Sequence, residues 1–64
     1  MSNYETILDR AEEVFGNKDR AEDWMVKVSD SLGTTPSKKC VTQEGMDKVL
    51  LHLIKIEQFH YYYG

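Results

Sequence analysis

Histidine and cysteine are the residue types in this chain that could form a metal site or a nucleophilic active site. The two histidines, His52 and His60, lie eight positions apart, so on one helix they would stand about 12 Å from each other along the axis. That separation is too large for two ligands of one ion. Cys40 is the one cysteine, and a lone thiol beside Val41 is typical of packing. We therefore predict no metal, no cofactor and no catalytic residue.

Carboxylates and glycine-containing turns offer no better candidates for chemistry. Glu12, Glu13, Glu22 and Asp23 fall on faces that we expect to be solvated, and paired carboxylates catalyse only in a pocket that shifts their pKa values. Residues 33–36, Gly-Thr-Thr-Pro, lack the lysine and glycine spacing of a phosphate loop. We therefore expect a protein that is not an enzyme.

The elements that would position these side chains are all helices. Ser2 and Glu5 have the spacing of a capping box, and Gly16 can take the left-handed conformation that ends a helix. Between them, apolar residues recur at the offsets of one helical face, namely Tyr4, Ile7, Leu8, Ala11, Val14 and Phe15. The pattern predicts a first helix that ends at a tight turn on Gly16.

A second helix follows from residue 18 to about residue 28. Asn17 is suited to cap it, and its apolar face would consist of Ala21, Trp24, Met25 and Val28. The turn formers of residues 29–35 indicate the one real loop, which we expect Leu32 to pin to the core.

A short helical turn and a long last helix complete the chain. Thr35 followed by Pro36 is typical of a helix start, and Thr42 is placed to cap the last helix. We expect glycine at position 45 to cost the helix little, because it lies in the first turn. The main apolar face of this helix would be Met46, Val49, Leu50, Leu53 and Ile54.

These elements predict an all-α fold, a small bundle of three main helices plus one short helical turn. We expect residues 1–64 to form a single helical domain without a separate DNA-binding domain, since this length supports one small core. The residues that we expect to be buried together are Ile7, Leu8, Ala11, Val14, Phe15, Trp24, Met25, Leu50 and Leu53.

Charge and composition narrow the classes of partner and the compartment. Eight Lys and Arg against eleven Asp and Glu give a net charge of -3, which argues against nucleic acid, because phosphate binding depends on clustered cations. A small domain with one cysteine favours a reducing, cytoplasmic location. The longest apolar stretch, residues 49–56, is interrupted by His52 and Lys55 and is too short for a membrane span.

The C-terminal part of the chain carries more apolar surface than one core face requires. Leu51 and Ile56 lie off the main stripe, and five ring-bearing residues follow, namely Phe59, His60, Tyr61, Tyr62 and Tyr63. A helix that is apolar on more than one side is buried on more than one side, and aromatic side chains dominate interface hot spots. We therefore predict that these seven residues bind a protein partner.

The order of several short motifs resembles the toxin-binding domain of the MbcA/ParS/Xre antitoxins. The motifs are residues 11–16 (Ala-Glu-Glu-Val-Phe-Gly), Ala21 with Trp24-Met25, Leu32-Gly33 with Thr35-Pro36, and Thr42, Gly45, Val49 and Leu53 ending in Ile56-Glu57. The resemblance implies a small helical bundle that binds a RES-type toxin and reaches with its C-terminal end into the cleft where the toxin consumes NAD. Larger members of the family place a helix-turn-helix DNA-binding part before this domain. In this sequence no such part precedes the matching residues, so we expect no operator binding here.

Three hypotheses for function remain open. In the first, the protein is an antitoxin that neutralises a RES-type toxin by occluding its active site. In the second, it is a free-standing inhibitor from a phage or mobile element that blocks a host defence protein. In the third, it is a homodimerisation module in which Leu51, Ile56 and the tyrosines meet a second copy.

Overall fold

The structure is a computed structural model that describes residues 2–63 and the side chains of residues 2–59. Its helices are α1 (Asn3–Phe15), α2 (Lys18–Met25), α3 (Pro36–Lys39) and α4 (Gln43–Tyr63). Within these residues there is no strand, only an isolated antiparallel bridge between Ser29 and Thr34. The predicted fold class, a small all-α bundle of three main helices and one short helical turn, is confirmed.

The predicted caps around the first turn of the chain are confirmed. The Ser2 hydroxyl accepts a hydrogen bond from the Glu5 amide at 3.1 Å, and Gly16 has a φ of 69°, which only glycine adopts without strain. The Gly16 amide donates to the Glu12 carbonyl at 2.7 Å and closes α1. The Asn17 side chain accepts an amide of the first turn of α2, so the chain reverses within two residues.

The second helix ends at Met25, three residues before the predicted end. The Ser29 amide donates to the Thr34 carbonyl at 3.1 Å, and this loop bond draws the chain out of the helix. Val28 was therefore wrongly assigned to the apolar face of the helix: its side chain is 66% exposed.

The short helix α3 begins as its residues predict. The Thr35 hydroxyl accepts from the Lys38 amide at 3.2 Å, and Pro36, which has no amide hydrogen to satisfy, occupies the first turn. The Thr42 hydroxyl likewise accepts from the Gly45 amide at 3.0 Å and caps α4. Both threonine caps are confirmed.

Gly45 has a larger role than its place in a first turn suggests. It is buried, and a Cβ atom on it would collide with the backbone carbonyl oxygen of Lys39. The end of α3 therefore lies against the start of α4 at a spacing that any side chain would widen. The first-turn argument concerns helix propensity alone, and the packed neighbour adds a separate reason for glycine at this position.

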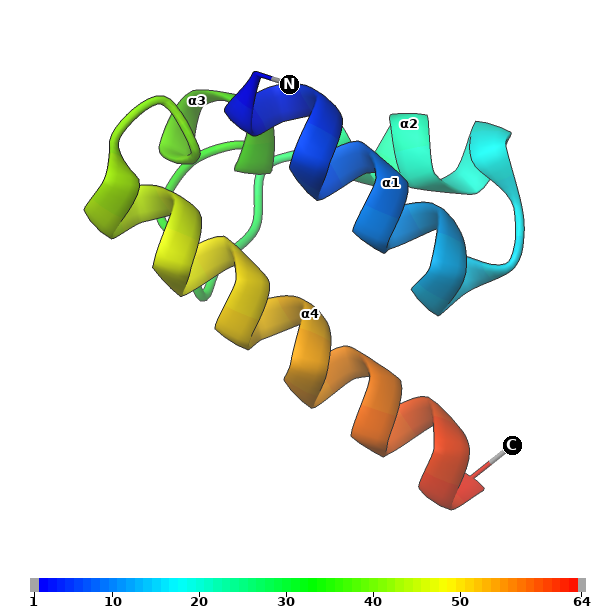
Figure 1. The fold of residues 1–64 in the computed structure, drawn as a ribbon. Coiled ribbons are helices and arrows are strands. Elements are labelled where there is room, and N and C mark those ends of the chain that lie inside the picture. Colours follow the sequence, from blue (N-terminus) through cyan, green and yellow to red (C-terminus); the bar gives the residue numbers. More distant parts are fainter. Residues whose placement is uncertain (1, 64) are drawn as a thin grey trace.

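The core lies where α1 packs against both α2 and α4 (Figure 1). The buried apolar side chains are Ile7, Ala11, Val14, Ala21, Met25, Cys40, Val49 and Leu53. Leu8, Phe15, Trp24 and Leu50 were also predicted to be buried; they are half-buried and pack against this cluster. Leu32, as predicted, packs there too and pins the loop. Ile54 is 41% exposed, because it lies about 100° round α4 from Leu53, and its assignment to the core face is wrong.

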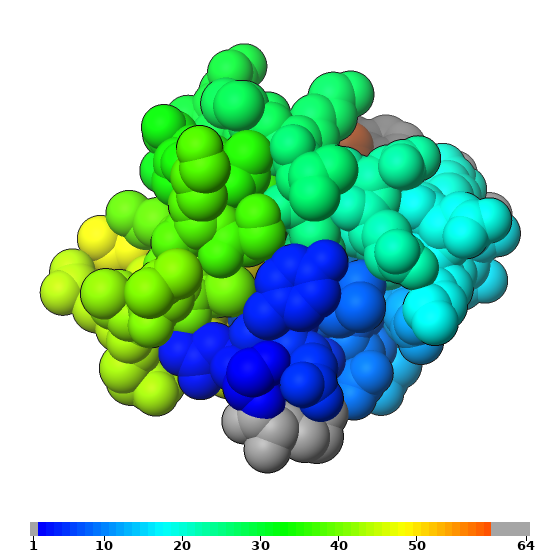
Figure 2. Space-filling model, turned by 90° about the horizontal axis from the view of Figure 1, so that it is seen from above, coloured from blue at the N-terminus to red at the C-terminus, as the bar shows by residue number. Residues whose placement is uncertain are grey.

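The N-terminal end of α1 is tied to the end of α3. The Asn3 side-chain amide donates to the Cys40 carbonyl at 2.8 Å. In Figure 2, seen from above, the start of α1 (blue) meets the loop and α3 (green) on one side and α2 (cyan) on the other.

Candidate functional site

A second stripe of side chains runs along α4 beside the face that packs into the core. Its members recur at intervals of three and four residues, which places them on one face, and they are Lys48, Leu51, His52, Lys55, Ile56 and Phe59. Leu51 is 52% exposed and Phe59 is 66% exposed. Two of the residues predicted to bind a partner therefore lie at the surface on a common face.

Of the other predicted partner-binding residues, the structure describes the side chain of Ile56 but not those of residues 60–63. Ile56 is half-buried and packs against the core, so it belongs partly to the bundle and partly to the stripe. His60, Tyr61, Tyr62 and Tyr63 continue α4, and their side chains lie outside the described residues. The stripe thus runs toward the predicted aromatic end of the chain without interruption of the helix.

The stripe faces the loop of residues 29–34 across two adjoining hollows. One, of about 250 Å³, is lined by Ser31, Leu32, Lys39, Lys48, Leu51, His52 and Lys55. The other, of about 450 Å³, is lined by Ser31, His52, Lys55, Ile56 and Phe59. Because they share Ser31, His52 and Lys55, we treat them as one feature, the α4 groove. An open groove of this kind accommodates side chains of a partner better than it encloses a small molecule.

The floor of the α4 groove is fixed by an aromatic stack. The imidazole of His52 lies parallel to the indole of Trp24, with ring centroids 6.1 Å apart and an interplanar angle of 11°. Trp24 in turn packs against Phe15 at 5.8 Å. The His52 Nε2 atom is 3.5 Å from the Ser29 hydroxyl. His52 therefore acts in packing and in holding the loop, which its position in an apolar run did not reveal.

The loop that forms the far wall of the groove is held by its own backbone. The Gly33 amide donates to the Ser29 carbonyl at 2.8 Å, and Gly33 has a φ of 74°. Together with the bond from the Ser29 amide to the Thr34 carbonyl, this makes a closed turn. A turn closed by several backbone bonds presents a preformed surface.

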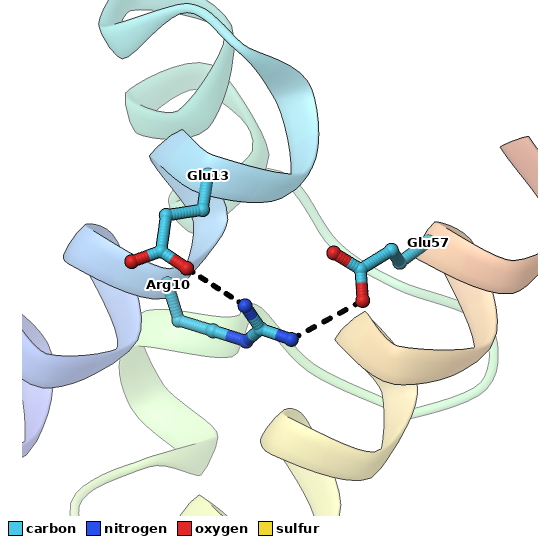
Figure 3. A network of polar contacts seen from close by, with 3 residues as sticks. All are labelled: Arg10, Glu13 and Glu57. Carbon is cyan, nitrogen blue, oxygen red and sulfur yellow. Dashed lines mark hydrogen bonds and ion pairs between the residues drawn. The ribbon is translucent and has the colours of Figure 1, made fainter. Parts of the chain in front are cut away.

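An ion-pair network sets the course of α4 beyond the core. The Arg10 guanidinium on α1 lies 2.8 Å from the Glu13 carboxylate on the same helix and 3.2 Å from the Glu57 carboxylate on α4 (Figure 3). Arg10 is half-buried and links the two helices one turn after Leu53, which is fully buried. Sequence alone did not indicate this pair, because 47 residues separate its members.

The remaining candidates for chemistry have structural surroundings. Cys40 is buried, and its thiol donates to the Ser37 carbonyl at 3.4 Å. Burial raises the pKa of the Cys40 thiol, which is the opposite of what an activated nucleophile requires. Among the described residues, no group of three or more histidines, cysteines or carboxylates is arranged to hold a metal ion.

We compared the chain with known proteins in three ways. No family model, no curated protein and no solved structure matches it. None of the helices in the described part of the chain combines the length and hydropathy of a membrane span. The geometry of the α4 groove and of the end of α4 is therefore the basis for a functional assignment.

Proposed function

We propose that the protein is a small protein-binding inhibitor that occludes a partner with the C-terminal part of α4. We take the class of partner, a RES-type NAD-consuming toxin, from the resemblance to the MbcA/ParS/Xre antitoxins. The observation that carries the proposal is that α4 continues beyond the buried Leu53 and presents exposed apolar side chains, Leu51 at 52% and Phe59 at 66%.

The geometry of α4 supports this mode of binding. Near this end of the helix, Ile56 contacts the core and Glu57 pairs with Arg10. The helix nevertheless continues through Tyr63, and its C-terminal end runs beyond the other helices (Figure 1). A preformed helix that projects from a folded body can enter a cleft without an ordering penalty for its backbone.

An ion pair joins α4 to α1 at the base of this projection. The pair of Arg10 with Glu57 holds α4 against α1 one turn after Leu53. The fold thus supplies a rigid base, and the residues after Glu57 supply the contact. This arrangement fits neutralisation by occlusion, in which the inhibitor needs no chemistry of its own.

The proposal is tested by capture of the partner with a matched truncation. The tagged full chain and a tagged chain that ends at Gln58 are expressed in the native host, and the proteins that co-purify are identified by mass spectrometry. We expect a RES-fold protein with the full chain and its loss with the truncated chain, while far-UV circular dichroism shows that both remain helical.

Two results would contradict this proposal. Equal recovery of the partner by both chains would place the contact elsewhere than the end of α4. Recovery of a host defence protein in place of a RES-fold protein would favour the alternative inhibitor function. Light scattering of the purified full chain supplies the third comparison, since a stable dimer that the truncation abolishes would favour the homodimerisation module.

A further inference from the structure

The α4 groove has a charge opposite to that of the protein as a whole. Among the described residues, its lining contains Lys39, Lys48 and Lys55 and no carboxylate, although the chain has a net charge of -3. Residues 1–30 carry eight of the eleven carboxylates against four of the eight lysines and arginines. The negative charge therefore gathers on the N-terminal half, and the groove is a local basic site.

Two of the three lysines are uncommitted within the described residues. Lys48 lies 3.4 Å from the Glu44 carboxylate one turn before it. Lys39 and Lys55 take part in no ion pair with a described residue. Asp47, which is next to Lys48 in sequence, is hydrogen-bonded to the Gln43 side chain at 3.0 Å. Ammonium groups that lack an internal partner can pair with the carboxylates of a ligand.

Apolar side chains lie between these lysines. Leu51 and Phe59 are exposed in the groove, and Leu32 and Ile56 are half-buried beside them. Lys55 lies on the same face of α4 as Leu51 and Phe59, four positions from each. The charged side chain is therefore one helical turn from each of the two exposed apolar side chains. The groove thus alternates apolar and cationic positions.

We infer that the α4 groove binds an acidic amphipathic segment of a partner protein, with large apolar side chains flanked by aspartate or glutamate. The apolar side chains pack on Leu51 and Phe59, and the carboxylates pair with Lys39 and Lys55. This inference rests on the proposed function and specifies the chemistry of the partner. Nucleic acid fits less well, because three lysines on an acidic protein neutralise few phosphates and the groove also offers apolar surface.

The position of Lys39 over the groove depends on the contact at Gly45. Lys39 is the last residue of α3, and its carbonyl lies against Gly45 of α4. Backbone packing therefore fixes the distance between the end of α3, which carries Lys39, and the stripe on α4. A fixed spacing of cationic groups gives the groove selectivity for the spacing of acidic groups.

The probe for this inference is a short fluorescein-labelled peptide in which leucine and phenylalanine recur every three or four positions among glutamate and aspartate. Its control carries glutamine and asparagine in place of the acidic residues. Binding to the full chain is measured by fluorescence anisotropy at low and high salt. We expect the acidic peptide to bind, the neutral control to bind about tenfold more weakly, and added salt to weaken the acidic complex.

Matched charge reversals locate the site. The double variant Lys39→Glu with Lys55→Glu should weaken binding of the acidic peptide about tenfold or more, because each change turns an attraction into a repulsion. Lys18→Glu with Lys27→Glu changes the net charge equally at exposed positions outside the groove, and should change binding less than about twofold. Far-UV circular dichroism of both variants establishes that they are folded.

Each remaining outcome overturns the inference. These outcomes are failure of the acidic peptide to bind, equal binding of the neutral control, and equal weakening by the two double variants. If a single-stranded oligonucleotide displaces the labelled peptide at the same concentration as unlabelled peptide does, the groove binds polyanions in general and the inference is overturned. If the peptide tests fail but the chain that ends at Gln58 loses its partner, the proposed function stands and only the inference of an acidic segment is rejected. If the truncated chain still binds the partner, the proposed function itself is refuted.

Discussion

Substitution of Gly45 by alanine tests the contact that holds α3 against α4. The added Cβ atom would overlap the carbonyl oxygen of Lys39, which belongs to the backbone and cannot rotate away. Either α3 must move from α4, or the first turn of α4 must unwind. Both responses disturb the Thr42 hydroxyl, which lies 3.0 Å from the same Cβ position and accepts the Gly45 amide.

The expected loss of stability is the difference between two opposing effects. Overpacking by one methyl group costs about 1–3 kcal/mol, and alanine in a helix is favoured over glycine by about 0.5–1 kcal/mol. The two ranges leave a net loss of about 0–2.5 kcal/mol. Because the overlap is with a backbone oxygen that cannot rotate away, we expect Gly45→Ala to lower the free energy of unfolding by about 1–2 kcal/mol. For a domain of this length that change lowers the Tm by about 5–15 °C.

Urea and thermal unfolding followed by far-UV circular dichroism measure this loss. Gln43→Ala is the matched control, because Gln43 lies in the same turn and is exposed, and an exposed substitution changes stability by about 0.5 kcal/mol or less. A Gly45→Ala protein as stable as the parent would refute the reasoning. It would mean that α3 separates from α4 freely and that Lys39 is not held over the α4 groove.

Three further predictions concern the core, the first turn and the thiol. Leu53→Ala should lower the free energy of unfolding by about 2–5 kcal/mol, whereas Ile54→Ala should lower it by about 1 kcal/mol or less in the same urea titration, because only Leu53 is fully buried; equal effects would contradict the core face. Gly16→Val should destabilise more than Gly16→Asn in thermal melts, since a Cβ atom there meets nothing within 4 Å and the penalty is the positive φ alone. Burial raises the pKa of the Cys40 thiol, so the unfolded state loses this proton first. The stability of the parent relative to Cys40→Ala should therefore fall as pH rises above about 8.5; a flat difference across urea titrations from pH 7 to 10 would contradict it.

Local features of the fold could be predicted from the sequence. The caps at Ser2, Asn17, Thr35 and Thr42 each depend on residues within three positions of the cap, and each is present. The turn at Gly16 depends on one residue type and one backbone conformation. Such signals do not require knowledge of the tertiary arrangement, which is why they could be interpreted before it was known.

Features that join distant segments could not be predicted in the same way. The end of α2, the role of Gly45 and the pair of Arg10 with Glu57 all depend on which segments lie side by side. The lysines of the α4 groove come from α3 and α4, and their common surface exists only after the helices pack. The exposed apolar residues Leu51 and Phe59 could be found from periodicity, because the stripe to which they belong lies on one helix.

The stack of Trp24 on His52 gives the protein an optical reporter of its own groove. Trp24 is the one tryptophan of the chain, and the imidazole stacked on it lines both hollows of the groove. An occupant that covers His52 changes the polarity of the surroundings of the indole. Emission from Trp24 therefore responds to occupation of the groove without any added dye, and titrations can be performed on the unmodified chain.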